Sequence, residues 1–166
     1  MSRGLPMGLF FLYFLLITGK DYLGGTMYFL KTQGNFDAAH FLEGYEGKCR
    51  NIHGHRWKVI AEIKGQTLGQ GQQTRGMLVD FGDLKEILKI YCDELDHCLI
   101  YEKGSLTPAT IQAFKEENFK IYEVPFRPTA ENFAFYFYKK LEEEGLNVHR
   151  VEVYETPNNC AAYQEC

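Results

Sequence analysis

The alternation of apolar and polar residues along the chain predicts strands and helices mixed in one domain. Residues 55–64 (HRWKVIAEIK) alternate with a period of two, which is typical of a strand with one buried face. After Asp83, by contrast, apolar residues recur three or four positions apart, as on one face of a helix. The same criteria predict strands at residues 27–41, 55–64, 77–81, 119–124 and 147–156, helices beginning at Asp83, Thr107 and Pro128, and a short strand near the C-terminus.

These elements follow one another in the order β-β-β-α-α-β-α-β. That order indicates an α+β fold in which antiparallel hairpins carry helices on one face of the sheet. Four glycines within residues 65–76 (GQTLGQGQQTRG) favour a hairpin connection between the second and third strands. The pattern shows no internal repeat, so we expect a single folded domain.

Composition narrows the class of protein. The chain has 166 residues, of which 45% are apolar and 24% charged, which is typical of a soluble globular protein and excludes intrinsic disorder. A net charge of −4 argues against a nucleic-acid partner held by bulk electrostatics. The five cysteines are odd in number and their spacings match no disulfide framework, so we expect reduced thiols and a cytoplasmic location.

The N-terminus departs from this pattern. Residues 8–18 (GLFFLYFLLIT) contain no charge, but they are shorter than the roughly 20 residues that cross a bilayer. Three interpretations stay open: an extension upstream of a true start at Met27, a hydrophobic anchor or packing segment, and a signal peptide. Because every motif lies after Met27, we expect residues 1–26 to be a hydrophobic extension outside the fold, residues 27–166 to form the domain, and no membrane partner.

Three of the five histidines, His40, His53 and His55, fall within sixteen residues. In an extended segment the side chains of His53 and His55 leave the same face, and His40 ends a preceding strand that could pair alongside. Three neutral imidazoles with one open position are what a catalytic zinc ion requires. The three histidines are therefore candidate zinc ligands, against the alternative of ordinary surface or core histidines.

Cys49 precedes this segment, in KCRNIHGH, between two basic residues. Nearby cations and a nearby metal both favour the thiolate, which would make Cys49 a catalytic base or nucleophile. Equally, Cys49 could be a fourth zinc ligand, which would close the site and make it structural. The residues alone do not separate these two interpretations.

Two further acidic residues, Asp96 and Glu155, are candidate functional residues. Asp96 stands next to His97 after the first helix, and a carboxylate can orient an imidazole and raise its basicity. Glu155 stands at the end of a strand, where its two oxygens could accept two parallel N–H donors. The alternative for Asp96 and His97 is a surface pair at a helix end. The alternative for Glu155 is a solvated residue at a strand end.

Six motifs in order extend over residues 27–166: FDAAHFL, KCRNIHGHRWKV, GMLVDFGDLK, LDH, RPTAENFA and VEVYETPNNCAAY. Together they resemble the 6-pyruvoyl-tetrahydropterin synthase superfamily. The resemblance is closest to the bacterial 6-carboxy-5,6,7,8-tetrahydropterin synthases of queuosine biosynthesis, because only three residues separate Cys49 from the HGH sequence. The N-terminal 26 residues have no counterpart in the family pattern, and the stretch from Cys98 to Arg127 is longer than in the shortest members and adds a helix.

The resemblance implies a role for each matching residue. The implied zinc ligands are His40, His53 and His55; the implied catalytic residues are Cys49, Asp96 and His97; and the implied substrate-binding residues are Glu155, Thr129 and Glu131. Among the last three, Glu155 matches the glutamate that holds the amino-pyrimidine edge of the pterin. The implied fold is the T-fold, whose sheets assemble as trimers stacked into hexamers with sites between subunits.

The implied activity is zinc-dependent conversion of 7,8-dihydroneopterin triphosphate to 6-carboxy-5,6,7,8-tetrahydropterin, with release of acetaldehyde and triphosphate. The implied partners are this small molecule, a Zn²⁺ cofactor and further copies of the chain. Two alternatives stay open at this point: the pyruvoyl branch, which eliminates triphosphate from the same substrate, and a non-catalytic structural zinc module.

Overall fold

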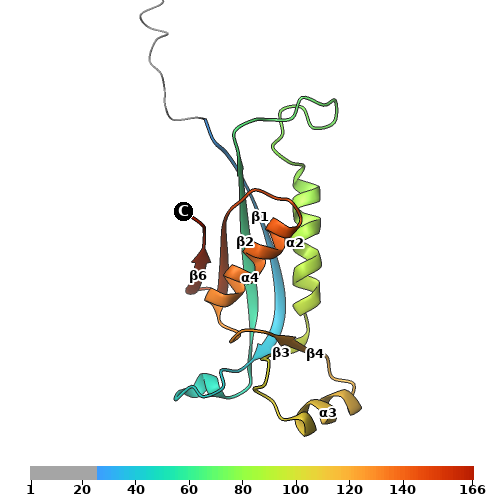
Figure 1. The fold of residues 1–166 in the computed structure, drawn as a ribbon, viewed down its shortest axis with the longest axis vertical. Helices are drawn as coiled ribbons and strands as arrows, with labels where there is room; N and C mark the ends of the chain where they lie inside the picture. Colours follow the sequence, from blue (N-terminus) through green and yellow to red (C-terminus); the bar gives the residue numbers. More distant parts are fainter. Residues whose placement is uncertain (1–25) are drawn as a thin grey trace, which may run out of the picture.

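The computed structural model describes residues 26–166, so the expectation for residues 1–26 as an N-terminal extension concerns residues outside this range, except for residue 26 (Figure 1). Six strands and three α-helices make up the described chain. Their bounds are β1 (Tyr28–His40), a 3₁₀ turn η1 (Lys48–Arg50), β2 (His53–Gly65), α2 (Phe81–Leu95), β3 (Cys98–Glu102), α3 (Pro108–Glu116), β4 (Ile121–Val124), α4 (Ala130–Glu143), β5 (Val148–Thr156) and β6 (Asn159–Tyr163).

All six strands belong to one sheet in the order β4-β3-β1-β2-β5-β6. The long strands β1 and β2 pair antiparallel along their full length, with His40 opposite His53 and Ala38 opposite His55. Strands β5 and β6 continue the antiparallel part, whereas β3 runs parallel to both β1 and β4. The α+β architecture is therefore confirmed, with a sheet that is mixed rather than wholly antiparallel.

We call the sheet face packed against α2 and α4 the inner face. Side chains alternate between the two faces of a strand, and the inner positions of β1 and β2 are buried in one apolar core, which includes Phe36, Trp57 and Val59. Gly34 lets α2 pack closely on β1, because a Cβ at this position would lie 2.8 Å from Cys92 Sγ. The core is thus built where sheet and helices meet.

The opposite side of the sheet is called the outer face. A smaller apolar cluster forms there, in which Leu99 and Tyr101 of β3 pack with Phe41 and with Phe114 of α3. Because Leu99 and Tyr101 alternate with the core residue Ile100, α3 lies on the face opposite to α2 and α4. Two helices therefore share the expected face, and the third does not.

The strand expected at residues 77–81 is wrong. Met77 takes part in a turn instead, because its backbone carbonyl accepts from the Gly69 N–H and its N–H donates to the Thr74 carbonyl. Asp80 then caps α2 by accepting from the Gly82 N–H at 2.6 Å, so the helix begins before the expected Asp83. The hairpin expected around residues 65–76 is consequently a connection from β2 to α2.

Strand β3 was not predicted at all. Its sequence CLIYE shows no alternation, because Cys98, Leu99, Ile100 and Tyr101 are all buried and both faces of the strand are covered. The remaining expected elements are confirmed, with ends that shift by a few residues.

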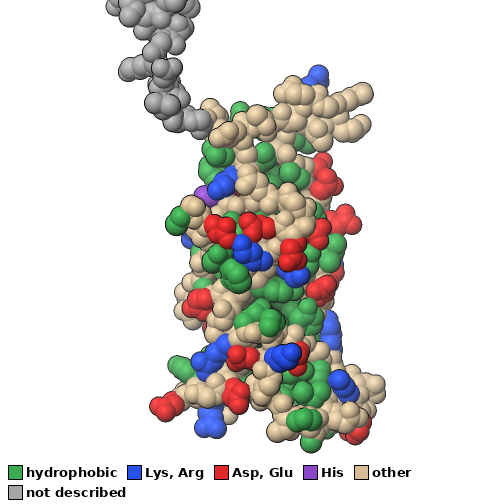
Figure 2. Space-filling view, viewed as in Figure 1, with side chains coloured by type: hydrophobic (Ala, Val, Ile, Leu, Met, Phe, Trp, Pro, Cys, Tyr) green, Lys and Arg blue, Asp and Glu red, His purple; other side chains and the backbone are tan. Residues whose placement is uncertain are grey.

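The surface over the helices carries charges of both signs. Figure 2 shows acidic and basic side chains intermixed there, and Lys139–Glu142 and Lys140–Glu143 are ion pairs along α4. Within residues 26–166, no helix combines the length and the apolar character that crossing a membrane demands.

Candidate metal centre and active site

The three candidate histidines meet at one end of the β1–β2 pair. His40 ends β1 and His53 begins β2 directly opposite, so both imidazoles project from the inner face. His55 lies two residues further along β2 and shares that face. The ring centroids are 4.5 Å apart for His40 and His53, 5.0 Å for His53 and His55, and 5.3 Å for His40 and His55. The structure therefore brings together the three residues that the sequence analysis selected.

Two backbone carbonyls determine which nitrogen of each ring is free. His40 Nδ1 lies 2.7 Å from the Pro128 carbonyl oxygen, and His53 Nδ1 lies 2.8 Å from the Asn51 carbonyl oxygen. A carbonyl only accepts, so each Nδ1 carries the hydrogen and donates it. In the neutral ring, each Nε2 then carries a lone pair that faces the centre of the cluster, as in a metal-binding histidine held by its other nitrogen.

Burial favours the neutral form of two of these rings, His40 and His55. His40 is 1% exposed, and burial lowers its pKa to about 4, while the pKa of His55 is also lowered, mainly by burial. Among the described residues, His40 Nε2 and His55 Nε2 have no hydrogen-bond partner although both atoms are buried. Buried acceptors without a donor are costly, so this donor set fits a bound cation.

Trp57 packs against two of the three histidine rings. It is fully buried in the core next along β2, and its ring centroid lies 4.9 Å from that of His40 and 5.7 Å from that of His55. Phe133 of α4 packs on its other side at 5.0 Å. The imidazoles of His40 and His55 therefore pack against buried aromatic side chains, which limit the rotation of the rings.

Glu155 of β5 joins the same cluster. One potential ligand atom from each of His40, His53, His55 and Glu155 lies within 4.8 Å of all the others. Glu155 Oε1 is 3.4 Å from His40 Nε2 and 3.7 Å from His55 Nε2. Within the described chain Cys49 is not a member of this group, so the fourth potential ligand is a carboxylate rather than the thiol considered from the sequence.

Cys49 lies in the short turn η1, which joins β1 to β2 just before the HGH segment. Its carbonyl accepts from the Leu42 N–H at 2.9 Å, and its side chain is partly exposed. Arg127 fastens the neighbouring loop by donating to the Glu43 carbonyl at 2.6 Å. The thiol therefore belongs to a loop that borders the histidine end of the sheet.

Thr129 and Glu131 begin α4, directly after the Pro128 carbonyl that holds His40. Thr129 is the N-cap residue: its hydroxyl accepts from the Asn132 N–H at 3.4 Å. Glu131 lies exposed in the first turn of the helix. The observed contacts of Thr129 position the helix and, through Pro128, the His40 ring.

Asp96 and His97 follow α2 and attach to β1 at Asp37. The Asp96 carboxylate accepts the Asp37 N–H at 2.7 Å, and the His97 N–H donates to the Asp37 carbonyl at 2.7 Å. Asp96 also accepts from His97 Nδ1 at 2.7 Å, and the Asp37 N–H in particular holds the pKa of its carboxyl below the usual range. Lys120 fixes the same segment by donating to the Asp96 carbonyl at 2.8 Å.

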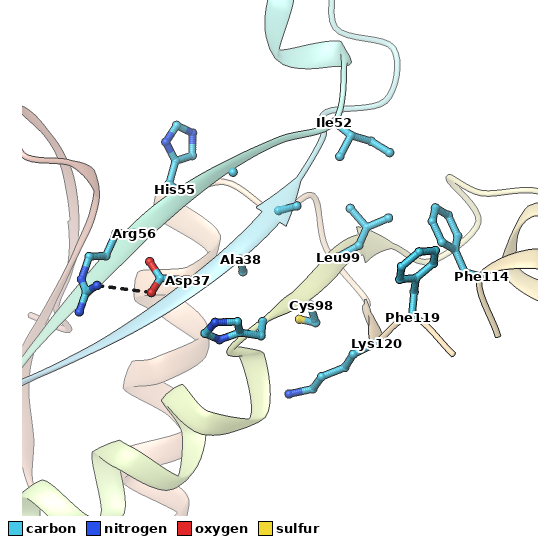
Figure 3. A pocket seen from close by; sticks show the side chains of 13 residues that line it. Asp37, Ala38, Ile52, His55, Arg56, Cys98, Leu99, Phe114, Phe119 and Lys120 are labelled. Carbon is cyan, nitrogen blue, oxygen red and sulfur yellow. Dashed lines mark hydrogen bonds and ion pairs between the residues drawn. The ribbon is translucent and has the colours of Figure 1, made fainter. Parts of the chain in front are cut away.

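This acid–base pair is separated from the histidine cluster. His97, 79% exposed, lines a cavity of about 660 Å³ together with the outer-face residues Asp37 and Arg56 and with Phe114 and Phe119, and His55 borders the same cavity (Figure 3). In the same view the His55 ring and the Arg56 side chain leave β2 in different directions. Within one chain, His97 therefore adjoins the outer-face residue Asp37, whereas the metal-binding nitrogens project from the inner face.

Several supporting groups had no signal in the sequence. The Pro128 and Asn51 carbonyls are backbone atoms, which every residue carries, so no residue type indicates their role. Lys120 was also missed, because its contacts are to the backbone carbonyls of Asp93 and Asp96, which no residue type indicates. Trp57 was recognised as a strand residue, and its position two residues after His55 on the same strand could have indicated its contact with the rings.

Comparisons with known proteins agree on one family. The model of the 6-pyruvoyl tetrahydropterin synthase family matches residues 30–166. The chain is 37% identical over 142 residues to the 6-carboxy-5,6,7,8-tetrahydropterin synthase of Haemophilus influenzae, covering 84% of this chain and all of that protein. It is 34% identical over 130 residues to the 6-carboxy-5,6,7,8-tetrahydropterin synthase of Rickettsia bellii, covering 74% of this chain and 90% of that protein.

Solved structures share the fold. An uncharacterized protein from Wolinella succinogenes superposes with a TM-score of 0.70 at 22% identity, covering 84% of this chain and 98% of the other. The 6-pyruvoyl tetrahydropterin synthase of Caenorhabditis elegans superposes with a TM-score of 0.60 at 24% identity, covering 85% and 97%. The curled sheet with its helices is thus the architecture of these proteins.

Proposed function

The chain belongs to the 6-pyruvoyl tetrahydropterin synthase family, and on that premise we propose that it is a 6-carboxy-5,6,7,8-tetrahydropterin synthase. The proposed reaction converts 7,8-dihydroneopterin triphosphate and one water molecule to 6-carboxy-5,6,7,8-tetrahydropterin, acetaldehyde and triphosphate, as a cytoplasmic step of queuosine biosynthesis. The observation that carries the proposal is the convergence of three imidazoles in a chain whose full-length relative in Haemophilus influenzae bears that name.

In this proposal His40, His53 and His55 hold a zinc ion through Nε2, the atom that the carbonyl contacts of His40 and His53 leave free. A bound zinc ion supplies Lewis acidity, which lowers the pKa of coordinated hydroxyl groups. Burial of His40 keeps this ligand in the neutral form that metal binding requires. Trp57 holds the rings in position.

Cys49 and the Asp96–His97 pair carry the proton transfers. Cys49, as thiolate, accepts and returns protons at the side-chain carbons of the substrate. His97 acts as the second acid–base group, with its ring oriented by the Asp96 carboxylate. Because His97 adjoins the outer face whereas the histidine cluster of its own chain projects from the inner face, the pair must come from a neighbouring copy, which favours a homo-oligomer such as stacked trimers.

Glu155 binds the amino-pyrimidine edge of the pterin, since a carboxylate presents two acceptor atoms to two parallel N–H donors. Thr129 and Glu131 border the same region through the start of α4. In this proposal the folded domain is residues 27–166, and residues 1–26 are a hydrophobic extension outside the fold.

Product identification tests the proposal. Zinc-loaded protein is incubated with 7,8-dihydroneopterin triphosphate, and the pterin product, acetaldehyde and triphosphate are each measured. We expect acetaldehyde and the carboxylated pterin in equal amounts. Triphosphate release with a pyruvoyl product and no acetaldehyde would assign the chain to the other branch of the family, and no turnover would reject the proposal.

A further inference from the structure

The peptide bond between Asp96 and His97 is held at both of its ends. Its N–H, which belongs to His97, donates to the Asp37 carbonyl of β1 at 2.7 Å. Its C=O, which belongs to Asp96, accepts from Lys120 Nζ at 2.8 Å. Lys120 Nζ also donates to the Asp93 carbonyl near the end of α2, at 3.3 Å. One peptide plane is therefore fixed between a strand of the sheet and a lysine from the segment that joins α3 to β4.

The orientation of this peptide plane sets the direction of the His97 imidazole. His97 has a left-handed backbone conformation, with a φ of 54°. Residues with a Cβ rarely adopt this conformation, and it persists where the surrounding structure holds it. The φ angle is the rotation between the peptide plane and the Cα that carries the imidazole. Holding the plane therefore holds the side chain in the direction from which Nδ1 contacts the Asp96 carboxylate at 2.7 Å.

The chemistry at the end of α2 suits a lysine. A helix leaves its last carbonyl groups without partners inside the helix, and its C-terminal end carries partial negative charge. The last turn of α2, which lies wholly within the described chain, contains Asp93 and Glu94 but no basic residue. Lys89, one turn earlier, pairs with the Asp93 carboxylate. The ammonium group of Lys120 supplies the helix end with both N–H donors and a positive charge.

The end of α3 determines where Lys120 lies. Asn118 has a φ of 60°, the left-handed conformation in which many helices end, and Asn is a residue that adopts it readily. The Asn118 N–H donates to the Lys115 carbonyl at 3.1 Å. The Phe119 N–H donates to the Phe114 carbonyl at 2.9 Å, which completes a Schellman motif, and the two phenyl rings pack with their centroids 6.1 Å apart. The direction of the chain after α3 is therefore fixed where Lys120 begins.

Lys120 is also joined to the strand that follows His97. Its carbonyl accepts from the Leu99 N–H at 3.0 Å, and the next residue, Ile121, pairs with Leu99 between β3 and β4. Lys120, Phe119 and His97 line the same cavity (Figure 3). The α3 segment therefore contacts the acid–base pair through one defined side chain.

We propose that Lys120 is a positioning residue for proton transfer by His97. It holds the peptide bond before His97, so that the imidazole keeps the direction that the reaction requires. The inference rests on the proposed function, which assigns acid–base chemistry to His97. Because Lys120 acts through the backbone and not on the reacting atoms, its loss should slow the chemical step and leave substrate binding nearly unchanged. A misplacement of about 1 Å can cost about 100-fold in rate.

Steady-state kinetics of the full chain loaded with zinc test this role. Lys120→Met removes the ammonium group at similar side-chain length, whereas Lys120→Arg restores N–H donors and positive charge. The matched control is Lys115→Met, which removes an exposed lysine from the last turn of α3.

We expect Lys120→Met to lower kcat for acetaldehyde release by about 10- to 100-fold, with KM within about twofold of wild type. Lys120→Arg should recover most of the lost rate, and Lys115→Met should equal wild type. A wild-type kcat in Lys120→Met would overturn the positioning role. A raised KM with an unchanged kcat would also overturn it, because Lys120 would then act by binding the substrate.

Amide hydrogen exchange at His97, followed by NMR, gives a readout without substrate. The His97 N–H is protected by the Asp37 carbonyl only while the peptide keeps its orientation. Lys120→Met should therefore speed exchange at His97 by about tenfold, whereas the Val59 amide in the centre of the sheet and the Lys115→Met control should stay unchanged. Unchanged exchange at His97 would overturn the proposal even if kcat falls. Lys120→Gln, with a shorter and uncharged side chain, replaces Lys120→Met if that variant does not fold.

The two measurements separate this inference from the proposed reaction. If Lys120→Met speeds exchange at His97 but wild type releases no acetaldehyde, the reaction assignment fails while the hold of Lys120 on the peptide stands. If wild type releases acetaldehyde and Lys120→Met matches it in both kcat and exchange, the positioning role fails and the reaction assignment stands.

Discussion

Co-expression of Cys49→Ala and His97→Ala subunits tests whether one active site draws on two chains. Cys49 belongs to the loop that borders the histidine end of the sheet, whereas His97 is held on β1 at Asp37 and lines the outer-face cavity. Each variant alone should lose activity, because general acid–base groups contribute about 10²- to 10⁴-fold to a rate. In a mixed oligomer, however, a His97→Ala subunit can supply Cys49 to a site to which a Cys49→Ala neighbour supplies His97.

The expected recovery follows from counting. With equal amounts and random assembly, half of the subunits retain Cys49 and half of their neighbours retain His97, so about a quarter of the sites are complete. A matched control co-expresses wild type with the Cys49→Ala/His97→Ala double variant. There, sites built from two chains again give about a quarter of the activity, whereas sites built within one chain give about half.

The assay is acetaldehyde release at equal total protein, with purified homo-oligomers mixed without subunit exchange as the baseline. Activity of the co-expressed single variants that does not exceed this baseline, combined with about half activity in the control, would refute the reasoning from the sheet faces.

Three further predictions concern the histidine cluster. Zinc added to metal-free protein should change the emission of Trp57, the single tryptophan, because its ring contacts His40 and His55; fluorescence titration checks this, and an unchanged spectrum at saturating zinc would contradict the contact. The metal-free protein should lose stability as the pH falls from 6.5 towards 4, because His40 becomes protonated in the unfolded state but not in the folded state, where its pKa is lowered to about 4. The loss in the free energy of unfolding is at most about 3 kcal/mol and can be measured by urea unfolding. The variant His40→Gln should lack this part of the pH dependence. Thr129→Ala should remove the N-cap of α4 and lower the free energy of unfolding by about 1 kcal/mol. Zinc binding should also weaken, because the adjacent Pro128 carbonyl holds the His40 ring. Wild-type values in both the denaturation and the zinc titration would contradict the positioning role of Thr129.

Local periodicity explains which parts of the fold could be predicted. Strands β1, β2 and β5 each bury one face, so their residues alternate and the pattern is visible in the sequence. Strand β3 is buried on both faces and shows no alternation, which is why it was missed. At residues 77–81 the short apolar sequence MLVDF was interpreted as a strand, but the backbone of Met77 bonds to a turn and Asp80 caps a helix.

For the candidate site, too, some features could be predicted from the sequence and others could not. The sequence by itself determined that His53 and His55 share a face, because residues two apart in a strand point to the same side, and it indicated His40 as their neighbour. It could not show that Glu155 approaches within 3.4 Å of His40, since that distance depends on the register of β1, β2 and β5 and on a bulge. Only the tertiary structure decided that Asp96 and His97 adjoin the outer-face residue Asp37 while the three histidines project from the inner face, because the face on which a distant segment packs is determined by the whole arrangement of strands and helices and not by the spacing of its own residues.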